Sequence, residues 1–216
     1  MAGIVVAGGR SSRFGRDKAS LPFGGGTLAG HVVQTLRAVT GEVIVVAGWT
    51  AALPDVRVPV VPDLVPDRGP LGGIHAGLHA VKDSLAVCVA CDMPFLRPDL
   101  LQYMLNESPG YDAVVPCVDG LYEPLHAVYA KSCLPVIERA LATPGARVAS
   151  VYPELKLRLL ERAELERFGD PAILLFNVNT LADYQLAIGR LEAAPAIPPC
   201  RSHGLREENK AGREKY

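Results

Sequence analysis

Short apolar runs alternate along this chain with longer stretches in which apolar residues recur at helical spacing. The runs predict strands at residues 4–7, 42–47, 58–61, 85–90, 113–116, 125–129 and 172–176. The intervening stretches predict helices at residues 27–39, 73–81, 98–106, 132–142, 162–167 and 180–190. Because the runs are apolar at nearly every position, both faces of the sheet should be buried. This alternation predicts an α/β fold of three layers, in which helices cover both faces of a mostly parallel central sheet.

We expect one domain over residues 1–191. The chain has 216 residues, a length that fits one ordinary domain, and no internal repeat or linker divides it. From Glu192 onward the sequence becomes rich in alanine and proline and then in charged residues. Such a segment cannot offset the entropy cost of its own ordering. Residues 192–216 are therefore expected to form a disordered C-terminal tail.

Composition excludes several classes of protein. The formal net charge is −1, which argues against general adhesion to nucleic acid or membranes through basic residues. No apolar run approaches the roughly 20 residues that span a bilayer, and the first residues lack the basic leader of a signal peptide. We therefore expect a cytoplasmic protein that binds neither nucleic acid nor membranes.

The cysteines fit a reducing compartment. There are five, an odd and sparse set that suits reduced thiols better than a disulfide framework. Cys88 and Cys91 have the C-x-x-C spacing, but residues three apart on a strand face opposite sides. A shared redox or metal role for this pair is not expected.

The segment after the first predicted strand is rich in glycine and basic residues. It contains Gly8, Gly9, Arg13 and Lys18 and lies at the carboxyl edge of the sheet, where open α/β folds bind ligands. Glycines let backbone N–H groups close around phosphate oxygens, and the basic side chains add positive charge. The spacing matches neither the G-x-x-x-x-G-K-[ST] loop nor the G-x-G-x-x-G fingerprint. Each residue alone would suit a turn or a solvated loop, but together they predict a phosphate site.

An aspartate follows another predicted strand at the same edge. Asp92 comes directly after an apolar run, and Pro94 stops that run from continuing. A carboxylate there is placed to hold Mg²⁺ against phosphate oxygens. Alternatively, Asp92 forms a turn or caps the helix that is expected to begin at Pro98.

A shaped loop lies between these two segments in the sequence. It begins with Asp63 and continues through Gly69, Pro70 and Leu71 into a predicted helix. The first N–H groups of that helix should point at the site. Asp63 would hydrogen-bond a sugar or a base edge, or it would form a turn through its side chain.

Two further polar pairs have the spacing of ligands. His75 and His79 are four apart on a predicted helix and share a face, but no third ligand is evident, and zinc needs three or four. We therefore do not expect zinc. Asn177 and Asn179 follow the last predicted strand, and Thr180 suits a helix N-cap. These asparagines cap the loop or reach a ligand.

Together these residues resemble the molybdenum cofactor guanylyltransferases, a branch of the nucleotidyltransferases of Rossmann-like fold. The resemblance spans residues 3 to about 190 and rests on five ordered blocks, at residues 7–18, 63 with 69–71, 91–94, 123–129 and 177–180. The first and third blocks specify the reaction class, whereas the Glu-Pro-Leu-His-Ala and Asn-Val-Asn-Thr blocks look like the molybdenum cofactor branch. The resemblance implies transfer of GMP from GTP to the terminal phosphate of molybdopterin, with Mg²⁺ as cofactor. It also implies transient contact with the proteins that supply molybdopterin and receive the product.

The same resemblance assigns roles to individual residues. The nucleotide-binding set is Val6, Ala7, Gly8, Gly9, Lys18, Asp63, Gly69, Pro70, Leu71 and Asp92. Asp92 is also the expected metal ligand, and Asn177 and Asn179 are expected on the pterin side. The chain departs from the family at Phe14, where methionine is usual, and at residues 47–49, which lack an asparagine that some members have.

The chemistry of these residues fits phosphoryl transfer. Joining two phosphates brings two anions together, so catalysis is chiefly positioning and charge neutralisation. We expect Lys18, Arg13 and Asp92 to be the catalytic residues, with the glycine-loop N–H groups stabilising the leaving pyrophosphate. A phosphate nucleophile is already ionised at neutral pH and needs no general base. The alternatives are a cytidylyltransferase or sugar-phosphate nucleotidyltransferase of the same fold, and a non-catalytic nucleotide-binding adaptor.

Overall fold

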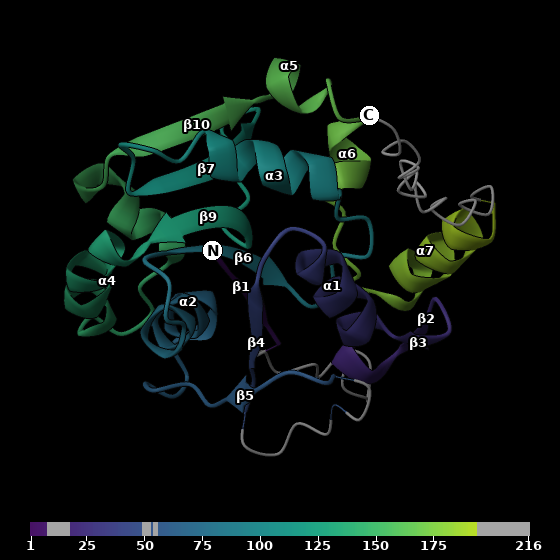
Figure 1. Ribbon diagram of the computed structural model, residues 1–216, viewed down its shortest axis with the longest axis horizontal. Coiled ribbons are helices and arrows are strands. Elements are labelled where there is room, and N and C mark those ends of the chain that lie inside the picture. The colour runs from purple at the N-terminus through teal and green to yellow at the C-terminus, as the bar shows by residue number, and fades with distance from the viewer. Residues whose placement is uncertain (8–17, 49–52, 54–55, 194–216) are drawn as a thin grey trace, which may run out of the picture.

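The computed structural model describes residues 1–7, 18–48, 53 and 56–193. Its main sheet has the strand order β10-β7-β9-β6-β1-β4-β5, and β8 pairs with β7 (Figure 1). The strands are β1 (Ala2–Val6), β4 (Glu42–Val46), β5 (Val60–Val61), β6 (Leu85–Ala90), β7 (Ala113–Val118), β8 (Leu121–Tyr122), β9 (His126–Ala130) and β10 (Leu157–Glu161). Neighbouring long strands are parallel except at β9, which runs antiparallel to both β6 and β7. The expected mostly parallel sheet is confirmed.

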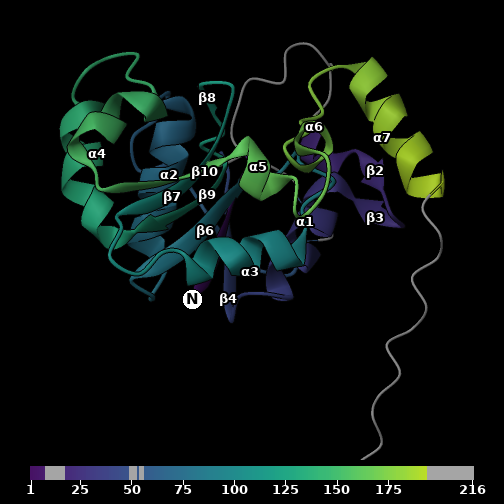
Figure 2. The same cartoon turned by 90° about the horizontal axis from the view of Figure 1, so that it is seen from above.

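Helices cover both faces of this sheet, as the three-layer prediction requires. The helices are α1 (Leu28–Arg37), α2 (Gly69–Ala80), α3 (Pro98–Asn106), α4 (Leu134–Leu141), α5 (Arg162–Leu165), α6 (Pro171–Leu174) and α7 (Leu181–Ala193). α2 and α4 lie on one face, and α1 and α3 lie on the other (Figures 1 and 2). Three 3₁₀ turns (Lys18–Ser20, Lys131–Cys133, Val148–Glu154) and a small hairpin of β2 (Pro22–Phe23) and β3 (Gly26–Thr27) complete the described elements.

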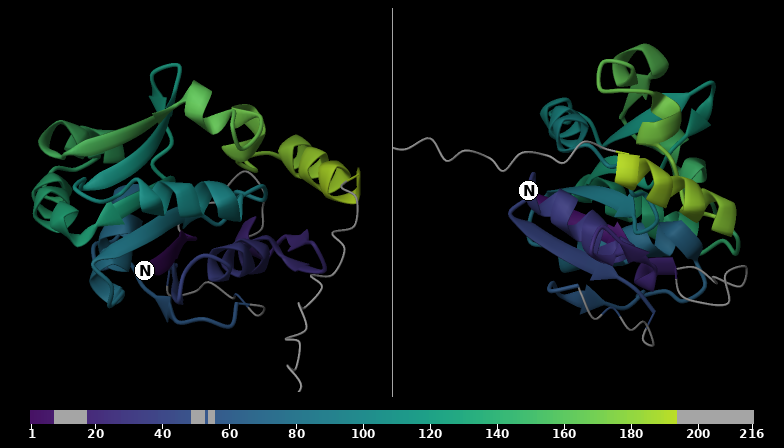
Figure 3. Two further views of the ribbon diagram at one scale, coloured as in Figure 1. Left: turned by 45° about the horizontal axis from the view of Figure 1, so that its top comes forward. Right: turned by 90° about the vertical axis from the view of Figure 1, so that its right-hand side faces the viewer.

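The two faces of the sheet support separate cores. On β1, Val5 packs into the core shared with α1 and α3, whereas Ile4 packs into the core shared with α2 and α4. Cys88 and Cys91 likewise belong to opposite cores, so these two side chains lie on opposite faces of the sheet, as their spacing predicts. A third hydrophobic cluster joins α7 to the β2–β3 hairpin. Both views of Figure 3 show this helix and the hairpin side by side at one end of the molecule.

Helix α2 lies unusually close to β1 because glycines face the strand. A Cβ at Gly77 would lie 2.5 Å from Ile4 Cγ2, and a Cβ at Gly73 would lie 2.6 Å from Val6 Cγ1. Real Cβ atoms do not approach that closely, so only glycine permits this packing. The contact fixes the first turn of α2 at the carboxyl end of β1.

The reversed strand β9 matters for the site. Val89, near the end of β6, is paired with His126, the first residue of β9. Residues that precede β9 therefore reach the same sheet edge as residues that follow β6. The sequence segments 91–94 and 123–125 meet at that edge.

Several predicted elements differ from the structure. The strand expected at residues 172–176 is wrong: Asp170 caps the Ala172 N–H and Pro171 occupies the first turn, which starts helix α6 instead. The strand β10 was not predicted, because Arg158 interrupts its apolar pattern. Helix α2 begins at Gly69, four residues earlier than expected. Helix α7 runs to Ala193, and residues 194–216 of the expected tail lie outside the described residues.

The C-terminal helix starts with reciprocal capping. The Asp183 N–H donates to Thr180 Oγ1, and the Thr180 N–H donates to the Asp183 carboxylate, which confirms the cap expected at Thr180. Within the described residues, none of the helices is both long and apolar enough to cross a membrane.

Candidate active site

Three sequence-predicted residues meet beyond the carboxyl ends of β1 and β6. Lys18 opens a 3₁₀ turn, and its Nζ lies 3.3 Å from Asp92 Oδ2 and 3.0 Å from Asn179 Oδ1. The Lys18 and Asp92 side chains are each 18% exposed, so the pair is shielded but reachable from solvent. We call these three residues the Lys18 centre.

Backbone hydrogen bonds hold the centre together. The Cys91 N–H donates to the Val6 carbonyl at 3.1 Å, which ties the end of β6 to the end of β1. The Val178 N–H donates to the Asp92 carbonyl at 2.9 Å, which ties the segment before α7 to Asp92. Asp92 does not cap α3, because that helix begins after Arg97 and the Asp92 carboxylate contacts Lys18.

Glu123 adds a second carboxylate beside Asp92. Burial raises the pKa of Glu123, hydrogen bonds from the Leu125 N–H and from Asn177 lower it, and the nearby negative charge of Asp92 raises it further. Asn177 Nδ2 donates to Glu123 Oε2 at 3.3 Å and to the Leu175 carbonyl at 3.0 Å. The two asparagines thus have different hydrogen-bond partners: Asn177 bonds to Glu123, and Asn179 bonds to Lys18. Their segment is not a strand.

The start of α2 forms another side of the site. Gly69 has φ +56°, a left-handed conformation that favours glycine, and Pro70 occupies the first turn. The N-cap residue Arg68 makes no side-chain capping bond with α2, and the first N–H groups of a helix have no partner within the helix itself. Asp63 lies beside this turn, since its Oδ1 would be 3.9 Å from a Cβ at Gly72. Burial raises the pKa of Asp63.

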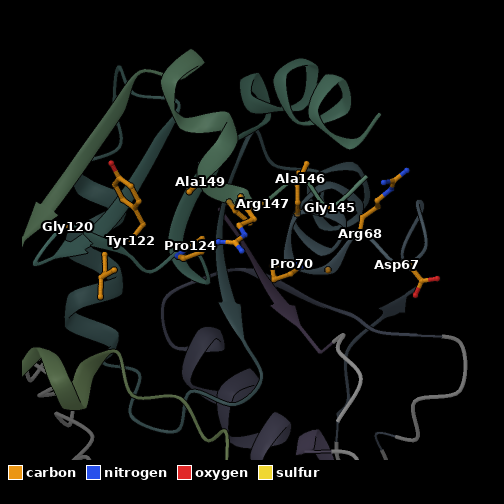
Figure 4. Close-up of a pocket in the computed structure, with 14 residues that line it drawn as sticks. Asp67, Arg68, Pro70, Gly120, Tyr122, Pro124, Gly145, Ala146, Arg147 and Ala149 are labelled. Atoms are coloured by element: carbon orange, nitrogen blue, oxygen red, sulfur yellow. The ribbon is translucent and has the colours of Figure 1, made fainter. Parts of the chain in front are cut away.

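A cavity of about 600 Å³ opens at the start of α2. Its walls come from the α2 N-terminus, the β8 turn with Pro124, and residues 145–149 (Figure 4). Gly69, Pro70 and Leu71 line it, as does Arg147, whose side chain lies between Pro70 and Pro124 in Figure 4. Its volume is within the range of small-molecule sites. Pro124, which lines the cavity, directly follows Glu123 in the sequence.

The other predicted residues have mixed outcomes. Gly8, Gly9 and Arg13 lie outside the described residues. Val6 is the last residue of β1 and Ala7 follows it; the Ala7 N–H donates to the Val46 carbonyl at 2.8 Å. Two residues to which the sequence analysis gave no role lie at this site: Glu123, which opens the block at residues 123–129, and Arg147. Glu123 had a usable signal, a carboxylate two residues before the apolar run that predicts a strand at residues 125–129. Arg147 had none beyond its charge.

The chain is similar to a group of known proteins. A family model described as the MobA-like NTP transferase domain matches residues 3–156. A protein of Pelotomaculum thermopropionicum named "Probable molybdenum cofactor guanylyltransferase" is 39% identical over 181 residues, which cover 84% of this chain and 88% of that protein. The molybdenum cofactor guanylyltransferase of Desulfosudis oleivorans is 33% identical over 202 residues, covering 89% and 96%. The crystal structure of molybdopterin-guanine dinucleotide biosynthesis protein A from Archaeoglobus fulgidus has a TM-score of 0.79 at 27% identity, covering 90% of this chain and all of that one.

Proposed function

The chain belongs to the MobA-like NTP transferase family, and on that premise we propose that it transfers GMP from GTP to the terminal phosphate of molybdopterin. The products would be molybdopterin guanine dinucleotide and pyrophosphate. The observation that carries the proposal is the Lys18 centre, which places a cation and a carboxylate together at the ligand-binding edge of the sheet.

Lys18 is the residue that meets the triphosphate. Its ammonium group is a compact charge with three donors, of which the carboxylate of Asp92 and the amide oxygen of Asn179 now orient two. Arrival of a triphosphate gives the same group phosphate oxygens as competing partners. Lys18 therefore binds and orients the substrate while it neutralises part of the charge that opposes attack by a second phosphate.

The donor set around Asp92 suits Mg²⁺. Mg²⁺ prefers carboxylate and other oxygen ligands together with substrate phosphates, and the oxygens of Asp92, Glu123 and Asn179 supply that chemistry. Two of these oxygens already contact the same cationic group, Lys18 Nζ, at 3.0 and 3.3 Å. Asp92 would hold the ion, which when bound supplies positive charge to the phosphates.

The nucleotide and the pterin are assigned to different parts of the site. Asp63, at the first turn of α2, would accept hydrogen bonds from the base or sugar of GTP. The first N–H groups of α2, at Gly69 and Leu71, would donate to an anionic or carbonyl oxygen. Asn177 and Asn179, on the segment before α7, would contact the pterin substrate. No residue needs to act as a general base, because the attacking phosphate is ionised at neutral pH.

The first experiment replaces one carboxylate at the Lys18 centre. Pyrophosphate release from GTP, Mg²⁺ and molybdopterin would be measured for the native chain and for Asp92→Asn. We expect the rate to fall by at least about 100-fold, the size of effect seen when one group that stabilises transition-state charge is lost. The matched control is Asp99→Asn, which removes a 51% exposed carboxylate paired with Arg97 on α3 and should leave the rate unchanged. Near-native turnover by Asp92→Asn would refute the assignment.

The second experiment tests the base. GTP, CTP, ATP and UTP would be compared as donors in the same assay, together with a sugar phosphate as an alternative acceptor. A preference for GTP with molybdopterin supports guanylyl transfer. A preference for CTP, or equal use of all four nucleotides, would refute it in favour of another nucleotidyltransferase. Nucleotide binding without pyrophosphate release would identify a non-catalytic adaptor.

A further inference from the structure

A cluster of metal-ligating side chains lies between α2 and α4. His75 and His79 lie one turn apart on α2, and Glu138 lies on α4. Glu138 Oε1 is 3.1 Å from His79 Nε2 and 3.7 Å from His75 Nε2. One ligand atom from each residue lies within 4.8 Å of the other two, and the two imidazole rings are 4.6 Å apart between centroids.

These separations suit a tetrahedral metal. Ligand atoms bonded at about 2 Å in a tetrahedral zinc site lie about 3.3 Å from one another, and the two nitrogen–oxygen distances bracket that value. Two imidazoles and one carboxylate form a mixed nitrogen and oxygen set, which suits Zn²⁺ and similar transition metals rather than Mg²⁺ or Ca²⁺. We propose that His75, His79 and Glu138 form a binding site for Zn²⁺ or a related divalent transition metal, with water as the fourth ligand.

The surroundings favour a ligand on His75. This side chain is 8% exposed. Its Nε2 is too far from Glu138 for a direct hydrogen bond, so a metal at Nε2 would give that nitrogen a bond. His79 and Glu138 are 41% and 51% exposed, which leaves a path for the ion from solvent.

The sequence did not predict zinc because its third ligand, Glu138, lies on another helix. Helical spacing pairs His75 with His79, but it does not reveal which other helix packs beside them. In the structure α4 covers the same face of the sheet as α2 (Figure 1), and this packing brings Glu138 to the pair. A bound ion would link the two helices, so it should stabilise the fold without taking part in turnover.

The test uses the full chain and Co²⁺ as a spectroscopic probe, because tetrahedral Co²⁺ with nitrogen and oxygen ligands absorbs visible light. We expect these bands in the native chain, and we expect Zn²⁺ to abolish them by competition. His79→Ala and Glu138→Gln should each weaken binding by about 100-fold or more, since loss of even an outer-sphere partner costs 10–100-fold. The matched control, Glu154→Gln, removes a nearby carboxylate of similar exposure, 57%, and should bind as the native chain does.

Two further measurements separate this site from others. Asp92→Asn should keep the Co²⁺ bands, because the proposed ligands are elsewhere, whereas loss of the bands in that variant would place the metal at the Lys18 centre and overturn the proposal. Zn²⁺ at a hundredfold excess over its dissociation constant should raise the melting temperature of the native chain by about 5–10 °C. Native-like Co²⁺ binding by both His79→Ala and Glu138→Gln, or no binding by the native chain, would also overturn the proposal.

Discussion

The buried imidazole of His126 should make the protein lose stability as the pH falls below 6.5. His126 opens β9 and is 0% exposed. Neither of its ring nitrogens has a hydrogen-bond partner within the described residues. Burial in apolar surroundings disfavours the charged ring and lowers the pKa of His126 to about 4. In the unfolded chain the ring titrates near 6.5, so between these values the unfolded state binds a proton that the native state does not.

The sign and size of the effect follow from that difference in pKa. The contribution of His126 to stability is complete above pH 6.5 and is lost as the pH falls toward 4. Linkage gives a loss of about 2 kcal/mol by pH 5 and about 3 kcal/mol by pH 4. His126→Leu replaces the ring with an apolar side chain of similar size that cannot titrate. The variant should be at least as stable as the native chain at pH 8, because it buries no unpartnered nitrogen.

Urea unfolding at pH 8, 7, 6 and 5 measures the effect. Burial also lowers the pKa values of His31 and His75, so the native chain and the variant should both lose stability on acidification. The difference between the two curves isolates His126 and should reach about 2 kcal/mol at pH 5. Parallel curves, or a histidine resonance assigned to His126 that titrates near pH 6.5 in the folded protein, would refute the reasoning.

Three further experiments test contacts that stabilise the fold around the site. Gly77→Ala would force a Cβ to 2.5 Å from Ile4 Cγ2, and the overpacking should lower the free energy of unfolding by about 1–3 kcal/mol. Gly189→Ala is the control, because no described residue outside the helix itself lies within 4 Å of a Cβ there, and it should stabilise α7 by about 0.5–1 kcal/mol. Urea unfolding compares the two variants. Thr27→Ala removes the oxygen that caps a backbone N–H of α1 and should cost about 1 kcal/mol, which thermal unfolding against Thr27→Ser would measure. Leu101→Ala, at a fully buried position, should cost about 2–5 kcal/mol and leave pyrophosphate release unchanged at a temperature where the variant is folded.

Much of the fold follows from local patterns. Continuous apolar runs predicted most of the main strands because parallel strands are buried on both faces. Helix α3 begins and ends where the sequence predicts, at Pro98 and Asn106, since a proline fixes its first turn. Local patterns failed where tertiary contacts decide. β10 is an edge strand stabilised by pairing with β7, and its Arg158 bonds to Glu164 and Glu107, so it lacks the apolar signature.

Prediction of the site from the strands assumed that every strand of the sheet is parallel, and it found only the residues that obey this assumption. In a parallel strand the residue after the carboxyl end reaches the ligand-binding edge, and this rule led from the sequence to Asp92. The rule overlooks Glu123, because β9 is antiparallel and the residues that precede it, Glu123 among them, reach that same edge. In a sheet with one reversed strand, residues after the parallel strands and residues before the reversed one must be considered together. Applied here, that rule adds Glu123 to Asp92 and predicts that Glu123→Gln weakens Mg²⁺-dependent pyrophosphate release. Unchanged release by Glu123→Gln would make its carboxylate a structural partner of Asn177 only.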